Sequence, residues 1–178
     1  RQVDAAQDAQ PQLLATSGES RIGGKTVHFR DPHEAIEAGV SIIYQERQIL
    51  MELSVAENIF LGRMPVNGLG VINPAIIEDF GLPIHPAAKV RDLSIAYQQM
   101  VEIMKAYSRE NLKVICFDEP TASLSDSEIE SLFAIIRKLK AEGKIIIYVS
   151  HRMSEIRQIA DKAAIFKDGR HMGIVSTA

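Results

Sequence analysis

The chain has 178 residues, and its hydrophobic share of 46% and charged share of 24% are ordinary for one globular domain with a real core. The formal net charge is −3 and no long run of one sign occurs, which argues against a nucleic-acid partner held by a basic face. The single cysteine excludes an internal disulfide, and no stretch is long and apolar enough to cross a membrane. If the protein works at a membrane, it must dock on something that spans it.

The first part of the chain predicts a hairpin, a short helix and a strand. Residues 1–15 are weakly patterned, and we expect a poorly ordered N-terminal segment there. Turn glycines between short alternating runs predict a β-hairpin over residues 19–29. Asp31, with a proline next and Glu34 three residues on, predicts a capped helix that a glycine ends. The apolar run at 40–44 then predicts a buried strand.

The middle of the chain, residues 51–110, is predicted to be mainly helical. Ser54 and the glutamate three residues later form a capping-box pattern, which opens a helix that Gly62 closes. A stretch rich in glycine and proline follows, with one short helical piece at 76–80. Residues 94–107 have apolar side chains spaced along one face, which predicts a longer amphipathic helix.

The last part alternates strands and helices. Residues 112–117 and 144–149 are nearly continuous apolar runs, which are typical of parallel strands covered on both faces. Cys116 lies within the first run, and we interpret it as a small buried hydrophobic residue rather than a nucleophile. A capped amphipathic helix lies between the two strands, a second helix at 152–160 follows them, and a hairpin begins at residue 163. This order predicts an α/β layer with a parallel sheet.

Two adjacent carboxylates, Asp118 and Glu119, follow the apolar strand at 112–117. In open α/β sheets, ligands bind at the carboxyl ends of the strands. A carboxylate there can hold Mg²⁺, because magnesium prefers oxygen ligands and keeps part of its water, and a second one can polarise an attacking water. The alternative is an acidic turn without a ligand.

Three other segments place polar residues where a ligand could bind. His151 follows the strand at 144–149, Gln45 follows the strand at 40–44, and Ser94 begins a helix whose free N–H groups favour an anion. Each has a structural alternative when it is considered alone. These alternatives are a histidine satisfied at a strand end, a glutamine in a surface loop and a plain helix cap.

In this order, the segments resemble the ATPase subunit of ABC transporters. Gln45 matches the Q-loop, 93–98 the signature segment, 114–119 the Walker B strand, 120–125 the D-loop and His151 the switch histidine. Ordered motifs in their expected strand and helix contexts support one another. The resemblance covers residues 16–175. The amino-acid sequence is most similar to the first ATPase half of ribose- and galactoside-type sugar importers in four segments: 53–63, 93–106, 118–128 and 148–156.

The resemblance implies hydrolysis of ATP with Mg²⁺, coupled to carbohydrate import. It assigns the catalytic roles to Glu119 and His151. It assigns metal binding to Asp118 and Gln45. The residues that it implies for nucleotide binding are Gln45, Ser94, Ala96 and Gln98.

The family resemblance also implies a fold and partners. We expect a P-loop NTPase-like, RecA-like α/β fold with a parallel-sheet core at 16–50 and 111–178 and a helical signature subdomain at 51–110. In this family two ATPase units enclose two ATP molecules. The implied partners are transmembrane permease subunits near residues 45–53, a second ATPase unit and, indirectly, a periplasmic or extracellular sugar-binding protein. The implied location is the cytoplasmic face of the cell membrane.

One expected motif, the phosphate-binding loop G-x-x-x-x-G-K-[ST], is missing from this sequence. The nearest candidate, residues 18–26, ends in Gly-Gly-Lys-Thr but is one residue too long, and it places Glu19 where the first glycine belongs. A carboxylate there would repel phosphate. We therefore predict a hairpin at this position and a partial fold without the first P-loop strand and helix. The stretch at 64–90 is also shorter than the family usually has.

Three functional hypotheses follow. The first is an ATPase subunit that powers carbohydrate import, and the second is a truncated, non-catalytic ABC-like module. The third is another ATPase of the same superfamily, in DNA repair or translation. The similarity of the four segments to sugar importers and the lack of a basic face disfavour this third hypothesis. Asp118, Glu119 and His151 favour the first hypothesis over the second, whereas the missing loop favours the second. Ala96 replaces the second signature glycine, and its Cβ would weaken a phosphate contact.

Overall fold

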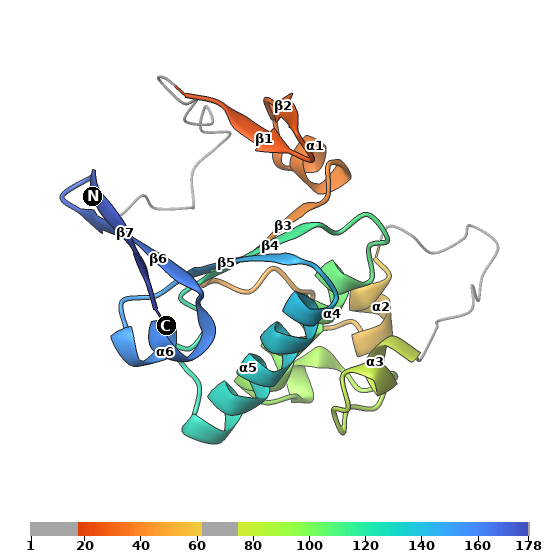
Figure 1. Cartoon of the computed structure of the whole chain (residues 1–178). Helices are drawn as coiled ribbons and strands as arrows, with labels where there is room; N and C mark the ends of the chain where they lie inside the picture. The colour runs from red at the N-terminus through yellow and green to blue at the C-terminus, as the bar shows by residue number, and fades with distance from the viewer. Residues whose placement is uncertain (1–17, 62–74, 178) are drawn as a thin grey trace.

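A three-stranded parallel sheet forms the centre of the computed structural model, which describes residues 18–61 and 75–177 (Figure 1). The predicted N-terminal segment 1–15 and the helix-ending Gly62 lie outside these residues. The sheet order is β3-β4-β5, and the register aligns Ile42 with Cys116 and Cys116 with Ile147. The strands are β3 (Val40–Ile43), β4 (Val114–Asp118) and β5 (Ile145–Val149). The predicted α/β architecture with a parallel sheet is thus confirmed.

The predicted N-terminal hairpin is present as β1 (Ser20–Ile22) and β2 (Lys25–Val27), which pair antiparallel. Gly23 and Gly24 form its turn with φ of +58° and +77°, values that glycine adopts without strain. The Gly-Gly-Lys-Thr stretch is therefore a turn followed by a strand, not a loop that enters a helix. Helix α1 (Pro32–Glu37) follows, and the Asp31 side chain caps it by accepting a hydrogen bond from the Glu34 N–H.

The middle of the chain folds into short helices and one long helix. The Ser54–Glu57 capping box has both of its bonds, since the Ser54 side chain accepts from the Glu57 N–H and the Glu57 carboxylate accepts from the Ser54 N–H. The elements are α2 (Val55–Ile59), α3 (Ala75–Asp79), the 3₁₀ helix η1 (Val90–Asp92) and α4 (Ile95–Tyr107).

The C-terminal elements follow the predicted order. Helix α5 (Asp126–Ala141) connects β4 to β5, and α6 (Met153–Ile159) follows β5. A hairpin of β6 (Lys162–Lys167) and β7 (Arg170–Ser176) comes last. None of the helices in the described part of the chain is long and apolar enough to span a membrane.

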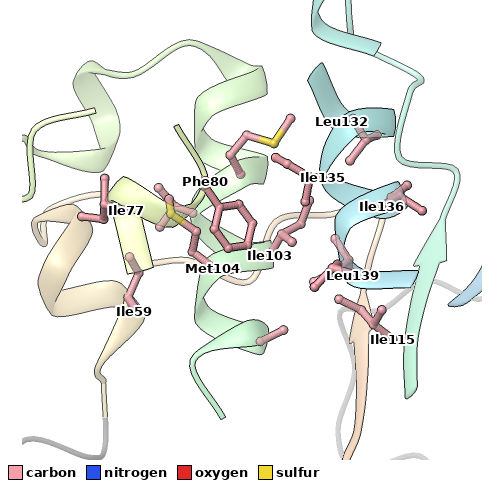
Figure 2. Packing of buried hydrophobic residues seen from close by; sticks show 14 of the residues in the cluster. Ile59, Ile77, Phe80, Ile103, Met104, Ile115, Leu132, Ile135, Ile136 and Leu139 are labelled. Atoms are coloured by element: carbon pink, nitrogen blue, oxygen red, sulfur yellow. The ribbon is translucent and has the colours of Figure 1, made fainter. Parts of the chain in front are cut away.

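Helices α4 and α5 lie against one face of the sheet and form the core (Figures 1 and 2). Ile115 and Phe117 of β4 point into this core. Because one buried cluster joins residues of the predicted sheet core and of the predicted helical subdomain, the two parts are packed together. The fully buried side chains of the two helices are Met100, Val101, Ile103, Met104, Leu132, Phe133, Ile136 and Leu139.

The opposite face of the sheet is open along β5, which makes the prediction of a strand buried on both faces wrong for residues 144–149, whereas Val114 of β4 is buried on that face. Side chains alternate along a strand, so Ile42, Cys116 and Ile147 share the face away from α4 and α5. Ile42 is 45% exposed and Ile147 50% exposed, and Cys116 is only partly buried. The elements among residues 18–61 and 75–177 leave the β5 part of this face exposed, although the apolar sequence of the strand suits a covered position.

Gly39 permits the close approach between α1 and the start of β4. Its φ is +94°, and a Cβ added there would lie 2.2 Å from the carbonyl oxygen of Asn111. We expect Gly39→Ala to lower the free energy of unfolding by about 3 kcal/mol, since backbone strain and a clash with main chain add together. Urea unfolding measures this change.

Gly81→Ala is the matched control, because Gly81 also has positive φ but a Cβ there meets nothing within 4 Å. It should cost only about 1 kcal/mol. Equal losses in the two variants would contradict the close-contact explanation.

Candidate functional site

The parallel register brings the predicted site residues to one edge of the sheet. Ile43 pairs with Phe117 and Asp118 pairs with Val149, so the carboxyl ends of all three strands lie at the same level. Gln45 is the second residue beyond β3, Glu119 the first beyond β4 and His151 the second beyond β5. Three segments that are far apart in the sequence therefore present polar side chains at one edge.

Glu119 and His151 are in direct contact. The Nδ1 atom of His151 lies 3.2 Å from Oε1 of Glu119, and the two side chains are 73% and 36% exposed respectively. Glu119 has a φ of +45°, which is unusual for a residue with a Cβ, and its N–H donates to the carbonyl of Val149 at 3.0 Å. This bond ties the turn after β4 to the end of β5. The pair is thus a solvent-accessible carboxylate and imidazole held by a constrained backbone.

Asp118 ends β4 on the open face of the sheet, with its side chain exposed. Its negative charge adds to burial in raising the pKa of the Cys116 thiol, with burial the larger cause, so Cys116 stays protonated and is a poor nucleophile. Among the described residues, no group of three or more His, Cys, Asp or Glu side chains comes together to hold a metal. Carboxylate oxygens such as those of Asp118 are of the kind that Mg²⁺ prefers, and Mg²⁺ needs few protein ligands because it keeps several waters.

The segment after Gln45 is held at Gln48 by helix α4. The Gln48 N–H donates to Oε1 of Glu102, and Nζ of Lys105 donates to the Gln48 carbonyl at 3.2 Å. Glu102 is 5% exposed, and burial raises the pKa of its carboxyl although the Gln48 N–H, Lys105 and Arg47 act in the opposite direction. Both polar main-chain groups of one residue are therefore bound by two side chains one helical turn apart.

Helix α2 holds the same segment two residues further on. The Asn58 side chain accepts from the Leu50 N–H at 2.8 Å and donates to the Leu50 carbonyl at 2.9 Å and to the Ser54 carbonyl at 3.0 Å. Asn58 is completely buried. Sequence reasoning missed Asn58 and Glu102 as supports of this segment. The available signal was a polar residue inside an otherwise apolar helix, which requires a partner when buried.

The predicted signature residues lie at the start of α4. Ser94 caps the helix through a long bond, 3.4 Å, from the Tyr97 N–H, and Ala96 is buried. Gln98 is 6% exposed and donates to the carbonyls of Val90 and Leu93 at 3.2 and 3.1 Å. These bonds are local. Among the described residues, no hydrogen bond joins Ser94, Ala96 or Gln98 to the residues at the strand ends. Its role in nucleotide binding remains a prediction.

Similarity to solved structures defines the fold first. A nucleotide-free ATP-binding cassette from an ABC transporter matches with a TM-score of 0.76 and 24% identity, covering 93% of this chain and 72% of that chain. The ADP conformation of an ATP-binding cassette of an ABC transporter matches with a TM-score of 0.78, 24% identity and the same coverage. The prediction of a P-loop NTPase-like α/β fold is thereby confirmed.

Family membership rests on a separate finding. The family described as ABC transporter matches residues 7–122, which is more than half of the chain. The chain belongs to the ABC transporter family, as its ordered motifs predicted.

Curated relatives narrow the similarity within the family. The arabinose import ATP-binding protein AraG of Yersinia pestis is 48% identical over 165 residues, which are 88% of this chain and 31% of that protein. The protein of the same name from Escherichia coli O6:K15:H31 is 47% identical over 165 residues, 88% of this chain and 32% of that protein. The chain thus spans about a third of the length of the curated relatives it matches.

Asn58→Ala tests the support of the segment after Gln45. The change leaves two main-chain groups of Leu50 without their partner in a partly buried position and removes the buried Asn58 amide, so we expect the free energy of unfolding to fall by about 3 kcal/mol. Asn111→Ala is the control, because Asn111 also bonds two main-chain carbonyls but at the surface, where water can replace it. It should cost about 1 kcal/mol in the same urea titration. If Asn58→Ala also lowered the free energy of unfolding by only about 1 kcal/mol, the proposal that Asn58 supports the segment after Gln45 would be refuted.

Proposed function

We propose that this chain is part of an ATPase subunit that hydrolyses ATP with Mg²⁺ and powers carbohydrate import through an ABC transporter. The observation that carries the proposal is the Glu119–His151 pair, placed beside Asp118 at the carboxyl edge of a parallel sheet. Identity of 46–48% to arabinose import ATP-binding proteins supports a sugar as the transported molecule.

The geometry suits hydrolysis by an activated water. The Glu119 carboxylate can accept a proton from a water beyond the strand end, as a general base. When both of its ring nitrogens carry a proton, His151 can donate from Nδ1 to Glu119 and from Nε2 toward a terminal phosphate. Asp118, with Gln45 beyond the end of the neighbouring strand β3, would hold Mg²⁺, which supplies positive charge to the phosphates when bound. Each of these residues acts from the end of a strand, so their relative positions are fixed by the sheet.

Tight nucleotide binding requires a phosphate cradle that these residues do not provide. Lys25 and Thr26, the only match to the end of such a loop, lie in strand β2 of the N-terminal hairpin. The free N–H groups at the start of α4, where Ser94 is the cap, would face the nucleotide of a second ATPase unit. We therefore expect the chain as printed to bind ATP weakly and to hydrolyse it negligibly.

The proposed partners follow from the same assignment. Transmembrane permease subunits would contact the segment at 45–53, which two helices hold in place at Gln48 and Leu50. A second ATPase unit would complete the nucleotide sites, and a periplasmic or extracellular sugar-binding protein would act indirectly. The subunit would lie on the cytoplasmic face of the membrane.

A truncated, non-catalytic ABC-like module is the second candidate. The observation that favours it is the hairpin at 20–27, which rules out the one stretch of the printed sequence that resembles a phosphate loop. The intact mass of the native protein separates the two candidates. A mass well above 19.7 kDa supports the ATPase, because a loop can then lie outside these residues, whereas a mass of 19.7 kDa supports the module.

Glu119→Gln in the native subunit tests the catalytic assignment. Removing the base should lower kcat for ATP hydrolysis by about 100-fold or more while ATP binding is kept. Phosphate release measures turnover, and fluorescence of a labelled nucleotide measures binding. Glu130→Gln, an exposed carboxylate of α5, is the control and should leave both unchanged. Equal loss of turnover and binding in Glu119→Gln would mean that Glu119 is structural.

A further inference from the structure

The carboxylate of Glu155, in helix α6, accepts hydrogen bonds from four side chains. Its Oε1 accepts from Oγ1 of Thr121 at 2.8 Å and from Nη1 of Arg152 at 3.3 Å. Its Oε2 accepts from the Tyr148 hydroxyl and from Oγ of Ser150, both at 2.9 Å. Nothing in the spacing of the sequence motifs points to this cluster.

Glu155 is ionised although it is 4% exposed. Burial alone would raise the pKa of its carboxyl, but the hydrogen bonds from Thr121, Ser150 and Tyr148 and the charge of Arg152 together lower the pKa. Burial and the Glu155 charge in turn raise the pKa of Tyr148, so its hydroxyl remains a donor. A buried carboxylate with four donors is a satisfied polar centre rather than a defect in the packing.

The four donors come from the two segments that carry Glu119 and His151. Thr121 lies two residues after Glu119, at the turn that follows β4. Tyr148 and Ser150 lie on either side of the last residue of β5, immediately before His151. Oγ of Ser150 also accepts from the Arg152 N–H at 3.0 Å, which bonds the chain on both sides of His151 to the same centre.

We propose that Glu155 is a positioning residue that sets the distance between Glu119 and His151. One carboxylate bonds the turn after β4 and the turn after β5, so neither turn can shift without breaking bonds of a buried charge. Only the consequence for turnover rests on the proposed function, and the geometric claim stands on this chain alone. Glu155 does not contact the reacting groups and acts through the backbone of its partners.

The arrangement of donors favours an ionised carboxylate at this position. All four partners donate, and an ionised carboxylate offers acceptor sites on both oxygens. The amide of glutamine has nearly the same shape but carries no charge and replaces one oxygen with NH₂, so the hydroxyl groups on that side would have to turn from donors into acceptors. Glu155→Gln therefore removes the charge and rearranges one side of the cluster without creating a cavity.

The experiment measures the coupling of His151 to Glu119 by NMR of the purified chain. The ring resonances of His151 are recorded with and without Glu119→Gln, first in the wild type and then in Glu155→Gln. We expect a clear response of His151 in the wild-type background and its loss in the Glu155→Gln background. Glu130→Gln, an exposed carboxylate of α5, is the control background and should keep the response.

Thr121→Val is a second variant that tests the claim if Glu155→Gln does not fold. Valine has the shape of threonine and removes only the bond from the β4 side, so the His151 response should weaken while the fold is retained. A full response in a folded Glu155→Gln or Thr121→Val chain would overturn the proposal.

ATP hydrolysis by the native subunit provides an independent test. If the subunit hydrolyses ATP, Glu155→Gln should lower kcat and leave KM for ATP nearly unchanged. A subunit without any turnover would refute the proposed function, but the NMR response would still decide the positioning role.

The pH dependence of stability gives one more prediction. Because the pKa of Glu155 is lower in the folded chain than its ordinary value of 4.5, the ionised carboxylate stabilises the fold above that value. This stabilisation is lost as pH falls through the lowered pKa. Thermal unfolding of the wild type should therefore weaken more steeply below pH 4.5 than that of Glu155→Gln, which has no carboxyl to protonate. Parallel pH profiles would contradict this.

Discussion

The parallel pairing of β3, β4 and β5 is the constraint on which the rest of the structure depends. Pairing of Ile43 with Phe117 and of Asp118 with Val149 ends all three strands at one level. A slip by one residue would turn every side chain to the other face of the sheet and would separate Glu119 from His151. Burial of Ile115 and Phe117 against α4 and α5 opposes such a slip. The hydrophobic core and the polar edge are therefore set by the same register.

Features that depend on nearby residues were predictable from the sequence. The capping box at Ser54, the hairpin at 20–27 and the order of strands and helices all follow from local patterns. Glu119 and His151 could be placed together, because consecutive parallel strands tend to be neighbours.

Features that depend on packing were not predictable. Glu155 in α6 and Glu102 in α4 have the spacing of ordinary helix residues, and only the tertiary structure buries them. The exposure of Ile147 was predicted wrongly for a related reason. An apolar run indicates that a strand favours burial on both faces. It does not indicate whether an element that covers those faces is among the described residues.

The open face and outer edge of the sheet have a consequence for handling the protein. In the described part of the chain β5 is an edge strand, and Ile145, Ile147 and Val149 are 45–60% exposed along it. An apolar edge with unpaired N–H and C=O groups is a template for strand pairing between molecules. Copies at high concentration should add to one another at this edge, so solubility would be gained by covering β5 rather than by stabilising the core.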